Sequence, residues 1–186
     1  MKNSYYTVQQ SDFICMHCRN LVFAGTVVAG VNHRNHCPYC LWSRHLDWRV
    51  AGDRLSACKA GMQPIGLTVK KTRKKYAHFG QGELMLVHRC TDCGKIAINR
   101  IAADDDSQTA MEIFEGSLYL DQRMRLALDQ NGIQVLRQED RTVVEVQLFG
   151  WCEPATAGSH HPNWDTTTFG FSQVFPFLDL ALEIEA

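Results

Sequence analysis

Six of the eight cysteines in this 186-residue chain occur as three Cys-x-x-Cys pairs, and this spacing constrains the fold more than any other feature. The pairs are Cys15 with Cys18, Cys37 with Cys40, and Cys90 with Cys93. Such pairs are typical of zinc knuckles, whereas disulfides and plain buried thiols are the alternatives. The N-terminal sequence MKNSYYTVQQSD lacks the apolar core and cleavage site of a signal peptide. We therefore expect a cytoplasmic protein with reduced cysteines.

The first two pairs can complete a zinc site by themselves. Together they supply four thiolates, which is enough for closed tetrahedral coordination of zinc. The segment between the pairs is long enough for a zinc-ribbon or treble-clef hairpin. We therefore predict a structural zinc site at Cys15, Cys18, Cys37 and Cys40.

A second zinc site is predicted around the third pair, which needs two more ligands. Cys58 is the candidate for the third ligand. The candidates for the fourth are His33, His36, His45 and His88, and among these we assign His36. The predicted second set is therefore Cys58, Cys90, Cys93 and His36.

The composition changes after Asp106, and we predict an α+β protein in two parts. Residues 1–106 would form a small zinc-ribbon or treble-clef-like module with one or two structural zinc sites. Residues 107–186 would form an acidic α+β extension. Within the module we expect short strands after the knuckles, a hairpin element at residues 25–30 and the start of a helix within residues 37–47.

The spacing of apolar residues predicts three elements in the extension. A helix is expected over residues 111–128, because apolar side chains recur there every three to four positions, and Asn131 and Gly132 would end it. Alternating residues predict a hairpin over 133–148 with its turn at 138–141. The tail alternates at residues 178–184 and is predicted to be a strand, with a helix as the alternative.

Opposite charges on the two halves are hidden by the net charge of −1. Residues 1–100 hold 15 Lys and Arg against 5 Asp and Glu, which gives +10, and residues 101–186 hold 4 against 15, which gives −11. A basic half favours a polyanionic partner such as RNA, although solvated surfaces without a partner would show the same charge.

Since no run of about 18 apolar residues occurs, we expect no membrane-spanning segment.

The strongest basic cluster is KKTRKK at residues 70–75, which is predicted to be a solvated loop or hairpin tip because glycines follow at 80 and 82. The aromatic residues Tyr39, Trp42, Trp48 and Tyr76 would stack on unpaired bases if exposed, or lie in the core. The residues predicted to contact nucleic acid are Arg34, Arg44, Lys70, Lys71, Arg73, Lys74 and Lys75.

The sequence HRNHCP at residues 33–38 resembles the motif that names the RNHCP domain family. The resemblance covers residues 11–106. The family is defined by this sequence pattern, so the resemblance implies no particular reaction. Further matches follow in order: Gly52, Asp53 and Arg54; Cys58; Gly61, Met62, Pro64 and Ile65; His88, Cys90, Cys93 and Gly94; Asn99, Arg100, Ile101 and Ala102; Asp104 and Asp105.

Three functions remain open from the sequence. RNA binding by the basic half is the one we favour. A metal-dependent nuclease or other hydrolase is the alternative, and its acid, base and ligand groups would be His33, Asn35, His36, His45 and Asp47. The third is a non-catalytic assembly role, in which the acidic extension docks a protein partner or pairs two copies of the chain.

Overall fold

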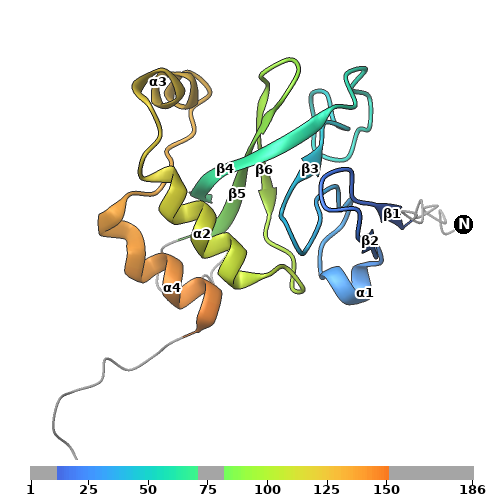
Figure 1. The fold of residues 1–186 in the computed structure, drawn as a ribbon, viewed down its shortest axis with the longest axis horizontal. Coiled ribbons are helices and arrows are strands. Elements are labelled where there is room, and N and C mark those ends of the chain that lie inside the picture. Colours follow the sequence, from blue (N-terminus) through green and yellow to red (C-terminus); the bar gives the residue numbers. More distant parts are fainter. Residues whose placement is uncertain (1–11, 71–81, 151–186) are drawn as a thin grey trace, which may run out of the picture. The chain divides into compact units, whose positions relative to one another are not determined.

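The computed structural model describes residues 12–70 and 82–150, which form a mixed α+β fold with two antiparallel sheets (Figure 1). The predicted α+β class is confirmed. The small sheet pairs β1 (Phe13–Ile14) with β2 (Leu21–Val22), and the large sheet has the strand order β3-β4-β5-β6. Each sheet contains a strand pair whose connection is one of the Cys-x-x-Cys turns, so the cysteine spacing and the strand pairing are linked.

The segment after β2 forms the short helix α1 (Thr26–Ala29) and not the expected hairpin element. Gly30 ends this helix with a φ of 66°, and its N–H donates to the Thr26 carbonyl. The N–H of Ala103 donates to the Ala29 carbonyl at 2.9 Å, which ties α1 to the loop that follows the large sheet.

The large sheet consists of β3 (Ser43–Arg44), β4 (Gly61–Lys70), β5 (Glu83–Cys90) and β6 (Ile96–Arg100). Residues 37–47 contain β3 and a tight turn in place of the expected start of a helix. The registers of β4 and β5 place Lys70 opposite Glu83 and Met62 opposite Cys90. Most of the basic cluster, residues 71–75, lies outside the described residues, so its predicted hairpin-tip conformation stays a prediction.

One face of the large sheet is covered by α2 (Ser107–Ser117) and α4 (Arg141–Phe149), which run side by side in Figure 1. Leu67 and Leu86 on the sheet pack there with Phe114 of α2 and Val144 of α4. Asp106 caps α2 by accepting the Thr109 N–H at 2.6 Å. The core therefore continues from the strands before residue 106 into the helices after it.

Successive residues of a strand point to opposite faces, so Val87 faces away from Leu86 and toward a second core. That core is closed by α3 (Gln122–Gln130), whose Leu128 is buried against Val87 and Ile96. The single helix predicted over 111–128 is two helices, because Asp121 starts a new one by accepting the Met124 N–H at 2.7 Å. Its predicted end is confirmed, since Asn131 is the C-cap of α3.

The hairpin predicted over residues 133–148 is wrong. Val135 instead forms an isolated bridge with Thr68 of β4, and a short 3-10 helix η2 (Gln138–Asp140) leads directly into α4. Val144 and Leu148 are four residues apart, so on a helix they lie on one face, and both contact the core of α2 and the sheet.

The strand predicted over residues 178–184 falls outside the described residues. Among the helices that are described, none is long and apolar enough to cross a membrane.

Candidate metal centres

The three Cys-x-x-Cys turns share one backbone conformation. In each, the N–H of the first cysteine donates to the carbonyl five residues later, and the N–H four residues later donates back to that cysteine's carbonyl. The fourth residue after the cysteine has a positive φ, which folds the chain back sharply. The turns start at Cys15, Cys37 and Cys90, with φ of 66° at Arg19, 57° at Leu41 and 72° at Gly94.

Positive φ is costly for residues other than glycine, by about 1 kcal/mol or more. Arg19 and Leu41 adopt it nonetheless, so the conformation is imposed by the surroundings and not by local preference. The three knuckles therefore repeat one backbone conformation, and Gly94 is the one residue that adopts it at little cost.

The first two turns bring Cys15, Cys18, Cys37 and Cys40 together, with all four sulfur atoms within 4.8 Å of one another. The Cys15 and Cys40 sulfurs are 3.6 Å apart, and those of Cys18 and Cys37 are 3.5 Å apart. Sulfurs on a tetrahedral zinc at about 2.3 Å lie about 3.8 Å from each other, whereas a disulfide needs about 2.05 Å. The four thiols therefore fit a zinc ion and are not bonded in pairs.

The environment of this cluster makes a cation necessary for four thiolates to coexist. Burial raises the pKa of Cys37 to about 11 and also raises the pKa of Cys40. Burial acts in the same direction on Cys18, but hydrogen bonds from the Asn20 backbone and the neighbouring thiols outweigh it and bring its pKa to about 7. Zinc would supply the charge that stabilises all four thiolates.

The third turn lies next to Cys58 and His45. The donor atoms of His45, Cys58, Cys90 and Cys93 again lie within 4.8 Å of one another. Cys58 and Cys90 have their sulfurs 3.6 Å apart, and His45 Nδ1 is 3.3 Å from the Cys93 sulfur. Burial lowers the pKa of His45, which keeps the imidazole neutral, the form that binds a metal. This set could also hold zinc.

His36, which we assigned as the fourth ligand of this set, is not part of it. Its Nε2 lies 2.8 Å from Asp105 Oδ2 in a separate polar network. His45 is the fourth member of the set instead, because it follows β3 directly. β3 pairs with the start of β4, which lies close to Cys58 and to the end of β5.

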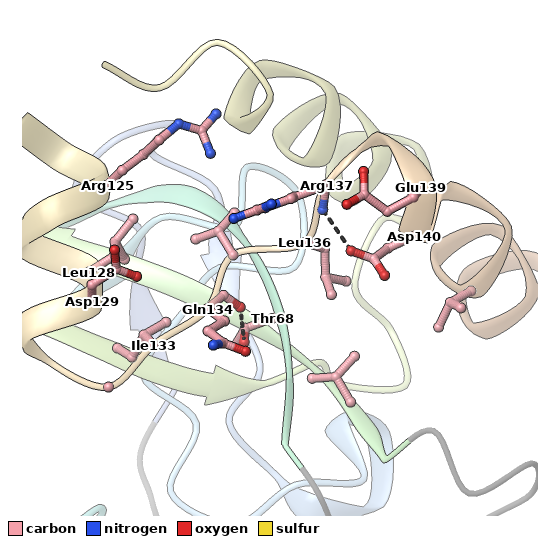
Figure 2. Close-up of a pocket in the computed structure, with 14 residues that line it drawn as sticks. Thr68, Arg125, Leu128, Asp129, Ile133, Gln134, Leu136, Arg137, Glu139 and Asp140 are labelled. Atoms are coloured by element: carbon pink, nitrogen blue, oxygen red, sulfur yellow. Dashed lines mark hydrogen bonds between the residues drawn. The ribbon is translucent and has the colours of Figure 1, made fainter. Parts of the chain in front are cut away.

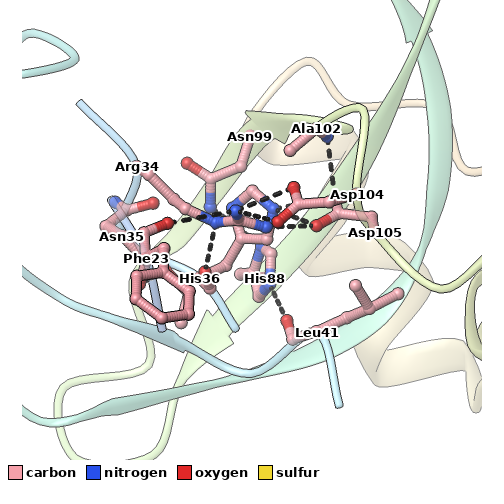
Figure 3. A network of polar contacts seen from close by, with 11 residues as sticks. Phe23, Arg34, Asn35, His36, Leu41, His88, Asn99, Ala102, Asp104 and Asp105 are labelled. Atoms are coloured by element: carbon pink, nitrogen blue, oxygen red, sulfur yellow. Dashed lines mark hydrogen bonds and ion pairs between the residues drawn. The ribbon is translucent and has the colours of Figure 1, made fainter. Parts of the chain in front are cut away.

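The polar network is built around Arg34, whose side chain is fully buried (Figure 3). Arg34 Nη1 donates to both oxygens of Asp104, at 2.8 and 2.7 Å, and Nη2 donates to Asp105 Oδ1 at 2.8 Å. Its Nε donates to the His36 carbonyl at 3.1 Å. The guanidinium therefore has a partner on every nitrogen.

His88 lies beside this network, with its ring centroid 6.3 Å from that of His36 (Figure 3). Burial lowers its pKa to about 3, so the ring is neutral. Its Nε2 donates to the Leu41 carbonyl at 2.7 Å, and its Nδ1 accepts from the Asn99 amide at 2.9 Å. His88 thus joins the second knuckle to β5 and β6.

A family model described as the RNHCP domain matches residues 10–111, which is more than half of the chain. The chain belongs to the RNHCP domain family. Comparison with curated proteins and with solved structures finds no match.

The five residues that spell RNHCP have distinct structural tasks here. Arg34 and His36 hold Asp105, and Cys37 belongs to the first metal cluster. The Asn35 carbonyl accepts the N–H of Arg44, and the Pro38 carbonyl accepts the N–H of Asp106. The RNHCP motif therefore joins the first candidate metal centre to the loop after β6, where Asp104 and Asp105 are its partners.

The residues predicted to contact nucleic acid lie in different environments in the structure. The prediction that Arg34 contacts nucleic acid is wrong. Arg34 is buried and its guanidinium is fully paired, so it is not available to a phosphate. Arg44 is partly buried, and Lys70 is exposed at the end of β4. Lys71, Arg73, Lys74 and Lys75 lie outside the described residues. Among the aromatics, Tyr39 and Trp48 are exposed, whereas Trp42 stacks on His17 with ring centroids 4.2 Å apart.

The residues considered for catalysis have other partners. His36 pairs with Asp105, His45 faces the second cluster, and Asp47 accepts the N–H groups of Gly52 and Arg54.

A pocket lies between β4 and the segment from α3 to η2 (Figure 2). Thr68 Oγ1 donates to the Gln134 carbonyl there at 2.6 Å, and the lining carries charges of both signs, such as Arg137 and Glu139. In the part of the chain that the structure describes, none of the predicted metal or nucleic-acid residues lines this pocket.

Proposed function

We propose that this RNHCP protein is an RNA-binding module whose two metal clusters hold zinc in a structural role. Each cluster offers four side-chain donors, so zinc bound there has its tetrahedral shell complete and no position for a substrate. This favours a scaffold over a catalytic metal.

The observation that carries the proposal is how the charges of the basic half are arranged. Four of its five acidic residues accept or pair within the chain: Asp12 accepts the Ala24 N–H, Asp47 and Asp53 accept N–H groups of one loop, and Glu83 pairs with Arg100. Several basic residues face solvent instead, namely Arg19, Arg49, Lys59, Lys70 and Arg89. The charged groups that this half presents to solvent are therefore mainly basic.

RNA with unpaired bases fits this surface better than duplex DNA, because exposed aromatic side chains can stack on unpaired bases. Sequence-specific RNA recognition mostly targets unpaired bases, which stack on aromatic side chains of the protein. Tyr39 and Trp48 of the basic half are both 54% exposed.

The test is the salt dependence of RNA binding by the full chain purified with its metal. We expect the association constant to fall steeply between about 50 and 200 mM salt, because each neutralised phosphate releases counterions. Replacing Lys70, Lys71, Arg73, Lys74 and Lys75 by Gln should weaken binding and flatten this slope without unfolding the protein. A matched control is Arg123→Gln with Arg137→Gln, two exposed basic residues of the acidic half, which should change neither. Absence of binding by the wild-type chain at 50 mM salt would overturn the proposal.

A further inference from the structure

Residues 47–55, which we call the Asp-held loop, have a backbone that is fixed from inside by two carboxylates. Asp53 accepts the N–H groups of Trp48 at 2.8 Å, Arg49 at 2.9 Å, Val50 at 3.0 Å and Leu55 at 3.1 Å. These N–H groups hold the pKa of Asp53 well below its usual range, so it is ionised. Asp47 accepts the N–H groups of Gly52 at 2.8 Å and Arg54 at 3.1 Å.

The Asp-held loop is also anchored to the second metal cluster. It begins two residues after His45, and Lys95, two residues after Cys93, donates from Nζ to the carbonyls of Asp47 and Trp48. Beyond its far end, the N–H of Ser56 donates to the Leu46 carbonyl at 2.9 Å, which closes the loop. The cluster and the two carboxylates therefore fix the loop at its ends and along its length.

Three apolar side chains of the Asp-held loop face solvent, while its two carboxylates turn toward its own N–H groups. Trp48 is 54% exposed, Val50 69% and Leu55 68%. The Arg49 guanidinium lies over the Trp48 ring, 4.4 Å from its centroid. An exposed tryptophan on a rigid backbone, stacked with an arginine, loses little conformational entropy when a ligand binds.

We propose that the Asp-held loop recognises unpaired bases of RNA, with one base stacked on Trp48 and the strand's phosphates near Arg49 and Lys59. This inference rests on the proposed RNA-binding function. Charge complementarity selects this ligand: both carboxylates of the loop are occupied by its own N–H groups, whereas Arg49 and Lys59 are exposed. Stacking of a base on an aromatic ring is sequence-tolerant, because every base has a π face.

The experiment compares two RNA probes at one salt concentration by fluorescence anisotropy, using the full chain with its metal. The probes are a labelled 12-nucleotide oligouridine and a labelled 12-base-pair RNA duplex. The variants are Trp48→Ala and Trp48→Phe, with Tyr119→Ala as a matched control, since Tyr119 is 87% exposed in the acidic half. Zinc content and melting temperature of each variant show that the fold is kept.

We expect Trp48→Ala to weaken oligouridine binding about 10-fold, the lower part of the range for loss of one base–aromatic stack. Duplex binding should change less than about twofold, because paired bases are not available for stacking. Trp48→Phe should keep most of the affinity, and Tyr119→Ala all of it.

The outcomes separate this inference from the proposed function. If the wild-type chain binds oligouridine and Trp48→Ala binds it equally well, RNA binding stands and the Asp-held loop is not its base-recognition element. Its exposed apolar side chains would then suit a protein partner instead. Equal losses on both probes would also overturn the stacking role. If the wild-type chain binds neither probe, both proposals fail.

Discussion

Arg34 Nη2 donates to Asp105 Oδ1 over 2.8 Å, although 71 positions separate the two residues in the chain. Both side chains are at most 1% exposed. This buried ion pair joins the RNHCP motif to the loop after β6, so the motif contributes to the stability of the fold.

Replacing Arg34 by Met should destabilise the protein by about 3–5 kcal/mol, because it leaves two carboxylates near the core without their cation. Arg34→Lys should be intermediate, since an ammonium cannot reproduce the paired guanidinium contacts. Urea unfolding at a fixed zinc concentration measures both. The control is Arg100→Met, which breaks the exposed pair with Glu83 and should cost less than about 1 kcal/mol. Equal losses for Arg34→Met and Arg100→Met would show that the buried network contributes little.

His45→Ala should reduce zinc from two ions per chain towards one when the protein is dialysed against a weak chelator, because three cysteines remain in a set that needs four donors. His36→Ala should keep both zinc ions and lower the melting temperature, because His36 holds Asp105 instead of a metal. Metal analysis of the two variants gives the answer. The reverse result, zinc loss in His36→Ala alone, would restore the ligand set expected from the sequence.

Gly66→Ala should destabilise the protein by about 1–3 kcal/mol through overpacking. A Cβ at Gly66 would lie 2.9 Å from Val135 Cγ1 and 3.0 Å from Ser117 Cβ, so β4 approaches the segments beyond residue 106 too closely for an added methyl. Gly116→Ala is the control, because nothing lies within 4 Å of its added Cβ and alanine favours a helix by about 0.5–1 kcal/mol. Chemical denaturation of both variants tests whether the sheet and the later helices share one core. A neutral Gly66→Ala would contradict that packing.

Asp53→Ala should free the backbone of the Asp-held loop without releasing zinc. We expect faster hydrogen exchange at the amides of Trp48, Arg49, Val50 and Leu55, since each loses its acceptor. Exchange measured by NMR reports on each amide separately, and Asp92→Ala, at an exposed acidic residue in the third knuckle, should leave all four unchanged. Unaltered exchange in Asp53→Ala would mean that the carboxylate does not fix the loop.

The cysteines of the two candidate metal centres were the part of the candidate sites that the sequence predicted best. Coordination chemistry is local: two thiols spaced by two residues already indicate a knuckle, and seven of the eight proposed ligands follow from cysteines alone. The α+β class followed in the same way from short alternating segments beside the knuckles.

The partners of Arg34 and the choice between His36 and His45 could not be predicted, because both depend on contacts between residues far apart in the chain. Four histidines suited the second cluster chemically, and only the pairing of β3 with β4 brings His45 to it. The helix α4 was mistaken for a strand because Val144, Val146 and Leu148 also alternate, and its packing against α2 decides the matter.

The central claim, two structural zinc sites with different ligand sets, is tested most directly by X-ray absorption at the zinc edge together with zinc per chain on the same sample. Four sulfurs in one site and three sulfurs with one nitrogen in the other predict two zinc ions per chain. The average shell would then hold about 3.5 sulfurs near 2.3 Å and about 0.5 nitrogen near 2.0 Å. A single zinc per chain, or a shell rich in oxygen, would contradict the account.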